Sequence, residues 1–376
     1  MHTKSKRFLS IIVVMVLALI VCKTTPARSN EATIVNITDT TSFPSCDPSG
    51  LTFSPDSGTL WLVDSEVNET DFFTGYNLFE LTPSGTVLGR YSTLGFSDEP
   101  TGITFNTVTG TLFITDDDQN MVFEVDPLTP ELALSEFSTE DFGSYDPEGI
   151  TFDSSNGNLF VVEGVNSYGL ARSVFEFTPS GALVSSMTLP TEIRDPEGIY
   201  FDIFTGNLFI VSSPDREYIF EVTTSGVIVN VIDIQSLERY NPKGITFAPS
   251  SDPNDCDNIF HLYVANYGRD EQMDGQIVEI SLETDILKFF DKSVEVGCLK
   301  GTGRRWYAKF RLCIMRWMLE TAAYCIEEGR NKAACFTLKR AYLRCDGKRR
   351  PRDFVVGEAT EQLAEMIQDL RDSLVR

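Results

Sequence analysis

Apolar and polar residues alternate in short runs over most of the chain. Between residues 45 and 290, runs rich in Val, Ile, Phe and Leu are separated by clusters of Gly, Pro, Ser, Asn and Asp. One copy of the pattern, starting at Gly149, reads GITF, NLFVVE, SVFEFTP and ALVSSMTL, with turn residues between the runs. Short runs of this composition, bounded by turn residues, predict antiparallel β-strands.

This four-strand pattern recurs, and each copy opens on a related motif. The motifs are DPSGLTF at Asp47, EPTGITF at Glu99, DPEGITF at Asp146, DPEGIYF at Asp195 and NPKGITF at Asn241. Their glycines are 46 to 52 residues apart, a period that is typical of a repeat array. Four antiparallel strands per period make one blade of a β-propeller. We therefore predict an all-β propeller of four-stranded blades; the motifs favour five blades, and a degenerate sixth blade stays open.

Several repeated features have a structural explanation. The stretch ATIVNITDTT, residues 32–41, resembles the outermost strand of the fourth copy, so we expect it to pair into the last blade and close the ring. The motif glycine lets the innermost strands crowd near the axis. A glutamate recurs in the third strand of every copy, which indicates a role in blade architecture; these residues are Glu80, Glu124, Glu176, Glu221 and Glu279.

The apolar spacing changes to three and four residues near Trp306, which is typical of helices. We predict helices over residues 306–329, 331–345 and 360–375. Cysteines lie along the first two helices, and in an oxidising compartment an antiparallel hairpin would pair Cys313 with Cys345 and Cys325 with Cys335. Ring closure would bring the two ends of the propeller together, which predicts a further Cys46–Cys298 bond.

The charges divide the chain at the same place. The net charge is −24, but residues 30–291 carry −36 and residues 292–376 carry +7. We therefore predict a propeller over residues 30–292 and a small, basic, cysteine-containing helical tail over residues 293–376. The acidic propeller disfavours nucleic acid as a partner and attracts cations. We expect the basic tail to dock on its acidic neighbour or on an anionic partner.

The N-terminus has the features of a secretory signal peptide. Lys4, Lys6 and Arg7 precede the apolar run FLSIIVVMVLALIVC, and small residues follow at Ala27 and Ser29. We predict a signal peptide over residues 1–29 and a secreted protein, periplasmic in a bacterium, with no stable membrane span after its removal. An uncleaved anchor is the alternative, although the run is short for a span.

The candidate site follows from the register of the blades. The residue before each motif glycine and the residue that ends the second strand should share one face near the axis. This places acidic and amide side chains around one channel mouth, with Lys243 as the only cation; they are Asp64, Asp116, Glu148, Glu163, Glu197 and Asn266.

Five carboxylates around one mouth cannot all ionise without a counter-charge. A divalent cation with oxygen ligands, most simply calcium, resolves this, and we assign Glu148, Glu197, Asp64, Asp116 and Asn266 as its ligands. The alternative is a solvated, hydrogen-bonded ring with local pairs to Lys243 and Arg194. Zinc is disfavoured, because His261 is the one histidine beyond the signal peptide and its strand pattern indicates a packed core residue.

The motifs DPEGI…F…TGNLFIV and LYVANYGRD…DGQIVEISL resemble the secreted propellers of the regucalcin/gluconolactonase superfamily, including members called SdiA-regulated or esterase-like, over residues 45–290. The resemblance implies a divalent metal held by a Glu in a PEG turn and an Asp closing a second strand. Here these are Glu148 or Glu197, and Asp64 or Asp116. The family's PNG turn has no counterpart, since its place holds Ser, Thr or Lys.

Two functions follow as hypotheses. The favoured one is a secreted, calcium-binding recognition module that presents its top face to an extracellular small molecule or protein. The alternative is a metal-dependent lactonase or esterase, with Glu148 and Glu163 as candidate catalytic bases. A polar pocket over the metal favours the enzyme, and a channel plugged by Lys243 or by the tail favours the recognition module.

Overall fold

The computed structural model describes most of the chain beyond residue 29. The described residues are 30–31, 33–65, 73–165, 172–203, 205–212, 218–234, 241–253, 260–269, 272–281, 286–327, 330–348 and 351–374. The predicted signal peptide, residues 1–29, lies outside them.

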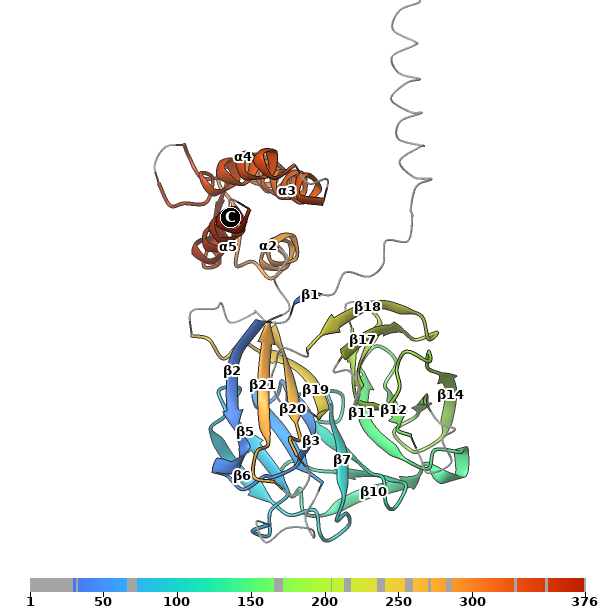
Figure 1. Ribbon diagram of the computed structural model, residues 1–376. Helices are drawn as coiled ribbons and strands as arrows, with labels where there is room; N and C mark the ends of the chain where they lie inside the picture. Colours follow the sequence, from blue (N-terminus) through green and yellow to red (C-terminus); the bar gives the residue numbers. More distant parts are fainter. Residues whose placement is uncertain are drawn as a thin grey trace, which may run out of the picture.

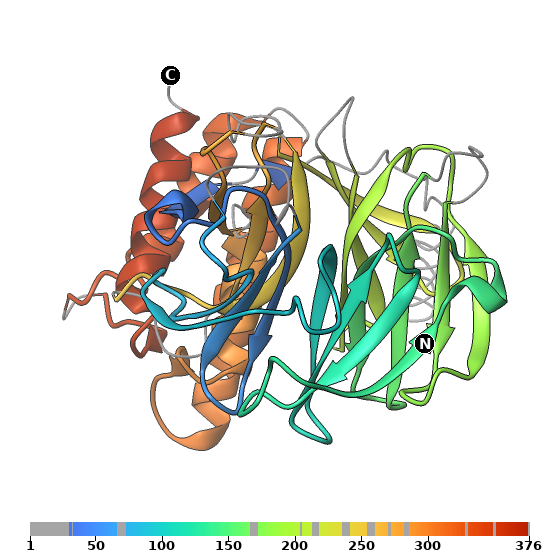
Figure 2. The same ribbon diagram turned by 90° about the horizontal axis from the view of Figure 1, so that it is seen from below.

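The described strands form the predicted five-bladed propeller, with four antiparallel strands in each blade (Figure 1, Figure 2). Blade I contains β3 (Pro48–Ser54), β4 (Thr59–Asp64), β5 (Leu78–Leu81) and β6 (Val87–Tyr91). Blade II contains β7 (Pro100–Asn106), β8 (Thr111–Asp116), β9 (Met121–Val125) and β10 (Ala133–Ser138). Blade III contains β11 (Pro147–Asp153), β12 (Asn158–Glu163), β13 (Ser173–Phe177) and β14 (Leu183–Thr188).

The last two blades include the N-terminal strands. Blade IV contains β15 (Pro196–Asp202), β16 (Asn207–Ser212), β17 (Tyr218–Thr223) and β18 (Ile228–Asp233), with β1 (Asn30–Glu31) parallel to β18. Blade V contains β19 (Pro242–Pro249), β20 (Phe260–Asn266), β21 (Gln276–Ser281) and β2 (Thr33–Asp39). The predicted pairing of the N-terminal stretch into the last blade is thus confirmed, and it closes the ring.

The motif glycines form the innermost ring of the propeller. A Cβ atom on each would lie within 3.0 Å of the backbone of the next blade, in the order Gly50, Gly102, Gly149, Gly198, Gly244 and back to Gly50. On Gly198, for example, it would lie 2.1 Å from the carbonyl oxygen of Lys243. Only glycine allows five inner strands to approach this closely, which explains the strict repeat of this residue.

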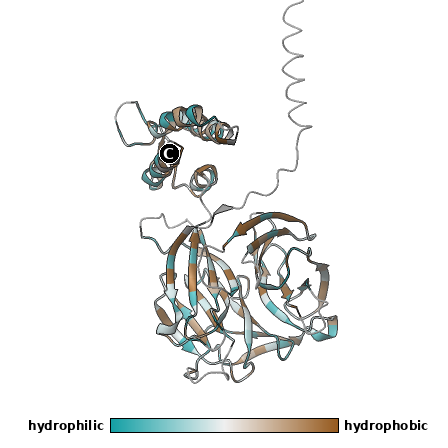
Figure 3. Cartoon of the chain, viewed as in Figure 1, coloured by the Kyte–Doolittle hydropathy of each residue, from teal (hydrophilic) through white to brown (hydrophobic). Residues whose placement is uncertain are grey.

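Apolar side chains fill the space between neighbouring blades, and Figure 3 shows hydrophobic segments along the strands. The recurring third-strand glutamates accept hydrogen bonds from the neighbouring strands. Glu80 accepts from the Thr59 hydroxyl at 2.9 Å, and Glu279 lies 2.8 Å from Nδ1 of His261, which is buried. The predicted structural roles of these glutamates and of His261 are therefore confirmed.

The C-terminal region contains the three predicted helices and one that the sequence analysis missed. The helices are α2 (Ile286–Glu295), α3 (Arg305–Glu327), α4 (Asn331–Tyr342) and α5 (Thr360–Ser373), with a short pair formed by β22 (Lys300–Gly301) and β23 (Val355–Val356). They share a hydrophobic core drawn from residues 286–374, and Figure 1 shows them grouped apart from the blades. The charge distribution predicted a boundary between residues 292 and 293. Because α2 begins at Ile286, this boundary falls inside the helix. No helix among the described residues has both the length and the hydrophobicity needed to cross a bilayer.

The cysteines contradict the three predicted disulfides, Cys313–Cys345, Cys325–Cys335 and Cys46–Cys298. Thiols are carried by Cys46, Cys313, Cys325, Cys335 and Cys345. Cys298 is disulfide-bonded, but with none of these five.

The directions of the side chains explain the difference. Although α3 and α4 pack against each other, Cys335 faces α5, where its Sγ lies 3.8 Å from the carbonyl oxygen of Arg371. Cys345 follows α4 and donates to the carbonyl oxygen of Ala341 at the end of that helix, and Cys313 is exposed. Cys46 donates to Sδ of Met273 at 3.0 Å inside the propeller region, whereas Cys298 belongs to the helical core.

Candidate functional site

The upper mouth of the channel, defined as the end where the first strand of each blade begins, gathers most of the predicted site residues. In blade III Pro147 pairs with Glu163, and in blade IV Pro196 pairs with Ser212. The start of the first strand and the end of the second therefore meet at this mouth, as the sequence predicted. The residues before the motif glycines follow one another around the axis; they are Ser49, Thr101, Glu148, Glu197 and Lys243.

The side chain of the residue that ends each second strand forms hydrogen bonds within its own blade. Asp64 accepts from the backbone N–H of Asp47 at 3.2 Å, and Asn266 accepts from the N–H of Asn241 at 3.1 Å. Asp47 and Asn241 lie directly before the first strands of their blades, so each contact holds the loop that enters the blade against the end of its second strand.

The same contact recurs in the two other carboxylates at this position. Glu163 is fully buried and accepts from the Ser144 hydroxyl and from the N–H of Tyr145 at 2.9 Å. Asp116 accepts from the Ser97 hydroxyl at 2.6 Å and from the N–H of Gln119 at 2.7 Å. These side chains thus serve the loops of their own blades.

A different group of carboxylates converges at the mouth. Asp117, Asp146 and Glu148 each offer an oxygen atom, and the three atoms lie within 4.8 Å of one another. Asp117 directly follows β8 of blade II, while Asp146 and Glu148 lie at the start of β11 of blade III. Of the predicted ligands, only Glu148 belongs to this group; Asp64, Asp116, Glu197 and Asn266 do not.

The three carboxyl groups are all harder to ionise than in water. Burial, and then the charge of Asp146, raises the pKa of Asp117 to about 7. Burial, followed by the charges of Glu163 and Glu197, raises the pKa of Asp146 to about 6. Burial also raises the pKa of Glu148 well above its usual value, and the charge of Glu197 adds to this effect. The group therefore favours a bound positive charge.

Glu197 has its own cation instead. Nζ of Lys243 lies 2.7 Å from Oε2 of Glu197, and the two side chains are 21% and 5% exposed. Burial lowers the pKa of Lys243, but Glu148 and Glu197 outweigh this and raise it, so the lysine stays charged. Burial nevertheless keeps the pKa of Glu197 raised. Removing one member of a buried pair of this kind typically costs 3–5 kcal/mol.

A polar cavity of about 210 Å³ lies at this mouth. Asp117 and Glu148 of the carboxylate group line it, together with Lys243 and Tyr267. Its remaining wall is rich in hydroxyl and amide groups, from Ser49, Ser65, Thr101 and Asn241, with the carboxylate of Glu99. Lys243 thus lines this cavity without filling it, and the cavity presents both negative and positive charge to a small ligand.

The sequence analysis missed Asp117 and Asp146, although signals for both were present. Asp117 lies within DDDQ, one residue beyond the predicted end of the second strand, and Asp146 is the first residue of its DPEG motif. Successive residues of a strand point to opposite sides, so a shift of one residue moves a side chain from the loop to the channel mouth.

The donor set fits a hard divalent cation. Three carboxylates from two adjacent blades offer only oxygen, and cavity hydroxyls from Ser65 and Thr101 lie close to the same opening. Calcium accepts six to eight oxygen ligands in loose geometry, so further positions would remain for water or a substrate. No histidine or cysteine belongs to this group, and the chemistry therefore does not suit zinc.

The repeat region matches the family model described as phytase-like, with esterase-like activity of phytase, over residues 47–245. This match covers more than half of the 376-residue chain. The chain belongs to the phytase-like family. The resemblance to esterase-like propellers that the repeat motifs indicated is thereby confirmed, and the matched segment contains all three members of the carboxylate group.

Solved structures similar to this phytase-like chain are distant. A putative gluconolactonase is 12% identical with a TM-score of 0.42, over 67% of this chain and 92% of that chain. Hydrazine synthase of Kuenenia stuttgartiensis is 13% identical with a TM-score of 0.38, over 63% of this chain and 66% of that chain. The tail fibre of Staphylococcus aureus phage P68 is 13% identical with a TM-score of 0.43, over 63% and 50%. Similarities at this level carry no inference about function, and a comparison with curated proteins gives no match.

Proposed function

We propose that this phytase-like chain is a divalent-cation-dependent hydrolase of ester bonds, with the cavity at the upper mouth as its active site. One observation carries the proposal: Asp117, Asp146 and Glu148 converge beside a polar cavity that Lys243 also lines. The family description, esterase-like activity of phytase, supports the same class of reaction.

The cation, most simply calcium, would be held by Asp117, Asp146 and Glu148. When bound, such an ion polarises the carbonyl or phosphoryl oxygen of an ester and lowers the pKa of a water molecule. The raised pKa values of the three carboxyl groups support this assignment, because an added positive charge relieves the cost of ionising them together.

Lys243 would bind the acidic part of the substrate. Lys243 lines the same cavity as Asp117 and Glu148, and its ammonium group stays charged, since Glu148 and Glu197 raise its pKa. An ester carrying a phosphate or carboxylate would therefore span the cavity, with its anionic group at Lys243 and its reacting bond near Glu148.

Of the two candidate bases predicted from the sequence, Glu148 is the one that lines the cavity. Glu163 is fully buried and accepts hydrogen bonds from Ser144 and Tyr145, which suits a structural role. Glu148 could accept a proton from water at the cavity wall, in addition to or in place of binding the ion.

The enzyme would act outside the cell. The basic residues, apolar run and small residues within positions 1–29 support secretion, and an acidic propeller suits a cation-rich medium. The favoured hypothesis from sequence alone, a calcium-dependent recognition module, uses the same mouth. The family description and the open cavity support the hydrolase in preference to it.

The test combines cation binding with turnover. Calcium binding is measured by calorimetry, and hydrolysis is followed with p-nitrophenyl acetate, p-nitrophenyl phosphate and a simple lactone, each with calcium and with chelator. Asp117→Asn and Glu148→Gln should abolish both binding and turnover, while Asp118→Asn, an exposed neighbour outside the group, should leave both unchanged. Calcium binding without turnover of any substrate would support the recognition module, and absence of binding would overturn both.

A further inference from the structure

The helical tail exposes an unusual number of aromatic side chains. Among the described residues, all aromatic side chains that are more than half exposed belong to α3 and α4: Trp306 (69%), Tyr307 (56%), Phe310 (51%), Trp317 (60%) and Phe336 (64%). Two of the chain's three tryptophans are in this set. Large apolar side chains gathered on one surface generally mark a site of interaction.

Most of these residues share one face of α3. Trp306, Phe310, Cys313 and Trp317 are spaced by four, three and four residues, which places them along a single stripe of the helix. The rings of Trp306 and Phe310 stack with centroids 5.6 Å apart, and Trp306 packs edge-on against Tyr307 at 5.1 Å. None of these aromatic residues belongs to the hydrophobic core of the tail.

Basic side chains lie beside the stripe at the N-terminal end of α3. Arg304, Arg305 and Lys309 are exposed, and within the described part of the chain none of them forms an ion pair. The first turn of α3 contains no acidic residue. Positive side chains at a helix N-terminus are unfavourable, because the helix dipole is positive there. An anionic partner at this end of α3 would offset that cost.

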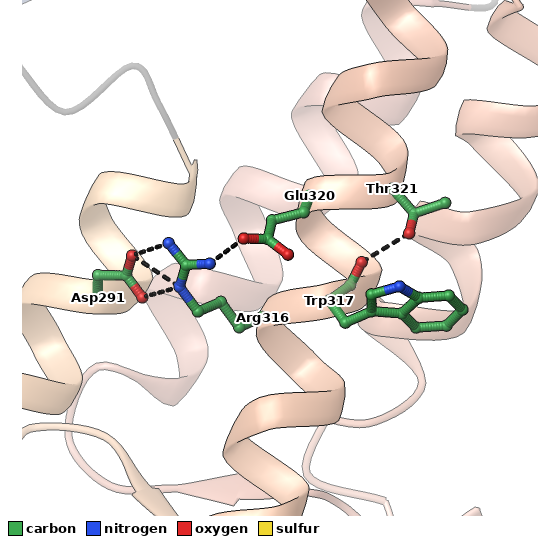
Figure 4. A network of polar contacts seen from close by, with 5 residues as sticks. All are labelled: Asp291, Arg316, Trp317, Glu320 and Thr321. Atoms are coloured by element: carbon green, nitrogen blue, oxygen red, sulfur yellow. Dashed lines mark hydrogen bonds and ion pairs between the residues drawn. The ribbon is translucent and has the colours of Figure 1, made fainter. Parts of the chain in front are cut away.

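Near its other end, the stripe adjoins an ion-pair network that links α3 to α2. Arg316 donates to both carboxylate oxygens of Asp291 on α2 and also pairs with Glu320, as Figure 4 shows beside the exposed ring of Trp317. The charge of Arg316 is therefore compensated within the protein. The uncompensated cations of α3 lie around its N-terminal half, next to Trp306, Tyr307 and Phe310.

We propose that the aromatic stripe of α3, defined as Trp306, Phe310 and Trp317 with the adjacent Tyr307, binds the surface of an anionic lipid bilayer. Tryptophan and tyrosine are favoured at the interface between water and lipid, since their rings are apolar with a polar edge. An interfacial helix combines such a face with flanking Lys and Arg, which attract anionic headgroups. Both elements are present on α3.

The charge of the propeller would set the orientation of the protein on the lipid surface. Residues 30–291 carry a net charge of −36, so the propeller is repelled by the same surface that attracts the tail. The last strand before the tail, β21, begins beside Asn266 at the upper mouth and ends at the opposite end of its blade. The chain therefore enters the tail from the end away from the carboxylate group, and the upper mouth would face the solvent.

The charges disfavour a parallel pairing of two copies through the stripe. In that arrangement Arg305 and Lys309 would lie against their equivalents, and like charges at short range are repulsive. A lipid surface has no such conflict.

The test uses tryptophan fluorescence of the full chain with vesicles of phosphatidylcholine alone or with phosphatidylglycerol. Trp61 is buried in the propeller, and residues 1–29 contain no tryptophan, so a change in emission reports Trp306 and Trp317. We expect a blue shift and quenching by brominated lipid with the anionic vesicles, and little change with phosphatidylcholine alone.

Two variants retain both reporters. Replacing Arg304, Arg305 and Lys309 together by Gln should weaken partitioning about a hundredfold, since each cation near an anionic surface contributes roughly fivefold. Tyr307→Ser with Phe310→Ser should also weaken binding. The matched control is Leu128→Ser, which removes an 88% exposed apolar side chain from the propeller and should have no effect.

Either of two results would overturn the proposal. One is the absence of any blue shift or quenching with anionic vesicles at low salt. The other is a concentration-dependent dimer, measured by sedimentation, that is lost in the Tyr307→Ser, Phe310→Ser variant while vesicle binding is not seen, because the stripe would then be an interface between copies. The hydrolase assays are independent of this outcome.

Discussion

Replacing Asp117 by Asn should stabilise the cation-free protein and remove its response to calcium. The exchange keeps the shape of the side chain and removes its negative charge from a group of three carboxylates within 4.8 Å. In the wild-type protein without a cation, folding brings these charges together, and the cost appears as raised pKa values.

The size of the expected stabilisation follows from the pKa of Asp117, which burial and Asp146 raise from 3.8 to about 7. A folded state that holds the proton more tightly than the unfolded state loses stability as pH rises. The free-energy cost of ionising Asp117 is absent below its pKa in the unfolded chain, grows between the two pKa values, and is complete above about 7. A shift of about three units corresponds to at most about 4 kcal/mol at pH 8. Relaxation around the partly exposed group should reduce this to about 2 kcal/mol.

The assay is urea unfolding at pH 8 and at pH 5, with chelator and with calcium. In chelator, Asp117→Asn should be about 2 kcal/mol more stable than wild type at pH 8, and the difference should shrink to less than half at pH 5. Calcium at about one hundred times its dissociation constant should stabilise the wild type by about 2.7 kcal/mol and leave the variant unchanged.

Asp118→Asn is the matched control, because Asp118 is the exposed neighbour and lies outside the carboxylate group. The reasoning is refuted if Asp117→Asn and Asp118→Asn have the same stability at pH 8 in chelator, or if calcium stabilises Asp117→Asn as strongly as wild type.

Four further outcomes are expected. Gly198→Ala should lower the free energy of unfolding by about 3 kcal/mol or more in thermal melts, because its Cβ would lie 2.1 Å from a backbone oxygen of the next blade. Lys243→Met should cost about 3 kcal/mol in urea unfolding, because Glu197 loses its buried partner at 2.7 Å. Glu279→Gln should cost about 1–3 kcal/mol through its contact with His261, and calorimetry should show unchanged calcium binding. Calcium affinity, measured by calorimetry, should fall from pH 8 to pH 6, because protons compete at carboxyl groups whose pKa values are about 7 and about 6.

Each of these expectations can be contradicted, and the first has a comparison in the same chain. Gly206→Ala should cost only about 1 kcal/mol, because no atom lies within 4 Å of its Cβ and only its positive φ is strained. A Gly198→Ala protein as stable as Gly206→Ala would contradict the close approach of the inner strands. If Glu279→Gln lost calcium binding, or if affinity did not change with pH, the assigned ligands would be wrong. A Lys243→Met protein of unchanged stability would contradict its pairing with Glu197.

The sequence by itself determined the architecture, because the architecture depends on features that repeat. Strand length, turn residues and the motif glycine recur five times, so a strand that is ambiguous in one copy can be assigned from the other copies. The same argument identified the third-strand glutamates as structural residues, and the strand pattern around His261 identified it as a core residue; the structure confirms both. The helices of the tail followed from their apolar spacing, apart from α2, whose pattern over Ile286–Glu295 was not recognised.

Only the tertiary structure decided which carboxylates meet. Asp116 and Asp117 are adjacent in sequence, yet the first holds the loop of its own blade and the second joins Asp146 and Glu148 from the next blade. Repetition predicts that equivalent positions share a face, but a single residue of register separates a loop contact from the channel mouth. The two disulfides predicted between α3 and α4 were wrong for a related reason. Spacing along the helices placed the cysteines at matching heights, but it did not give the direction in which each cysteine points around its helix. The periodicity of strands and helices depends on local sequence, so it can be predicted from the sequence. The direction of a side chain depends on the residues that pack around it, which the tertiary structure brings together.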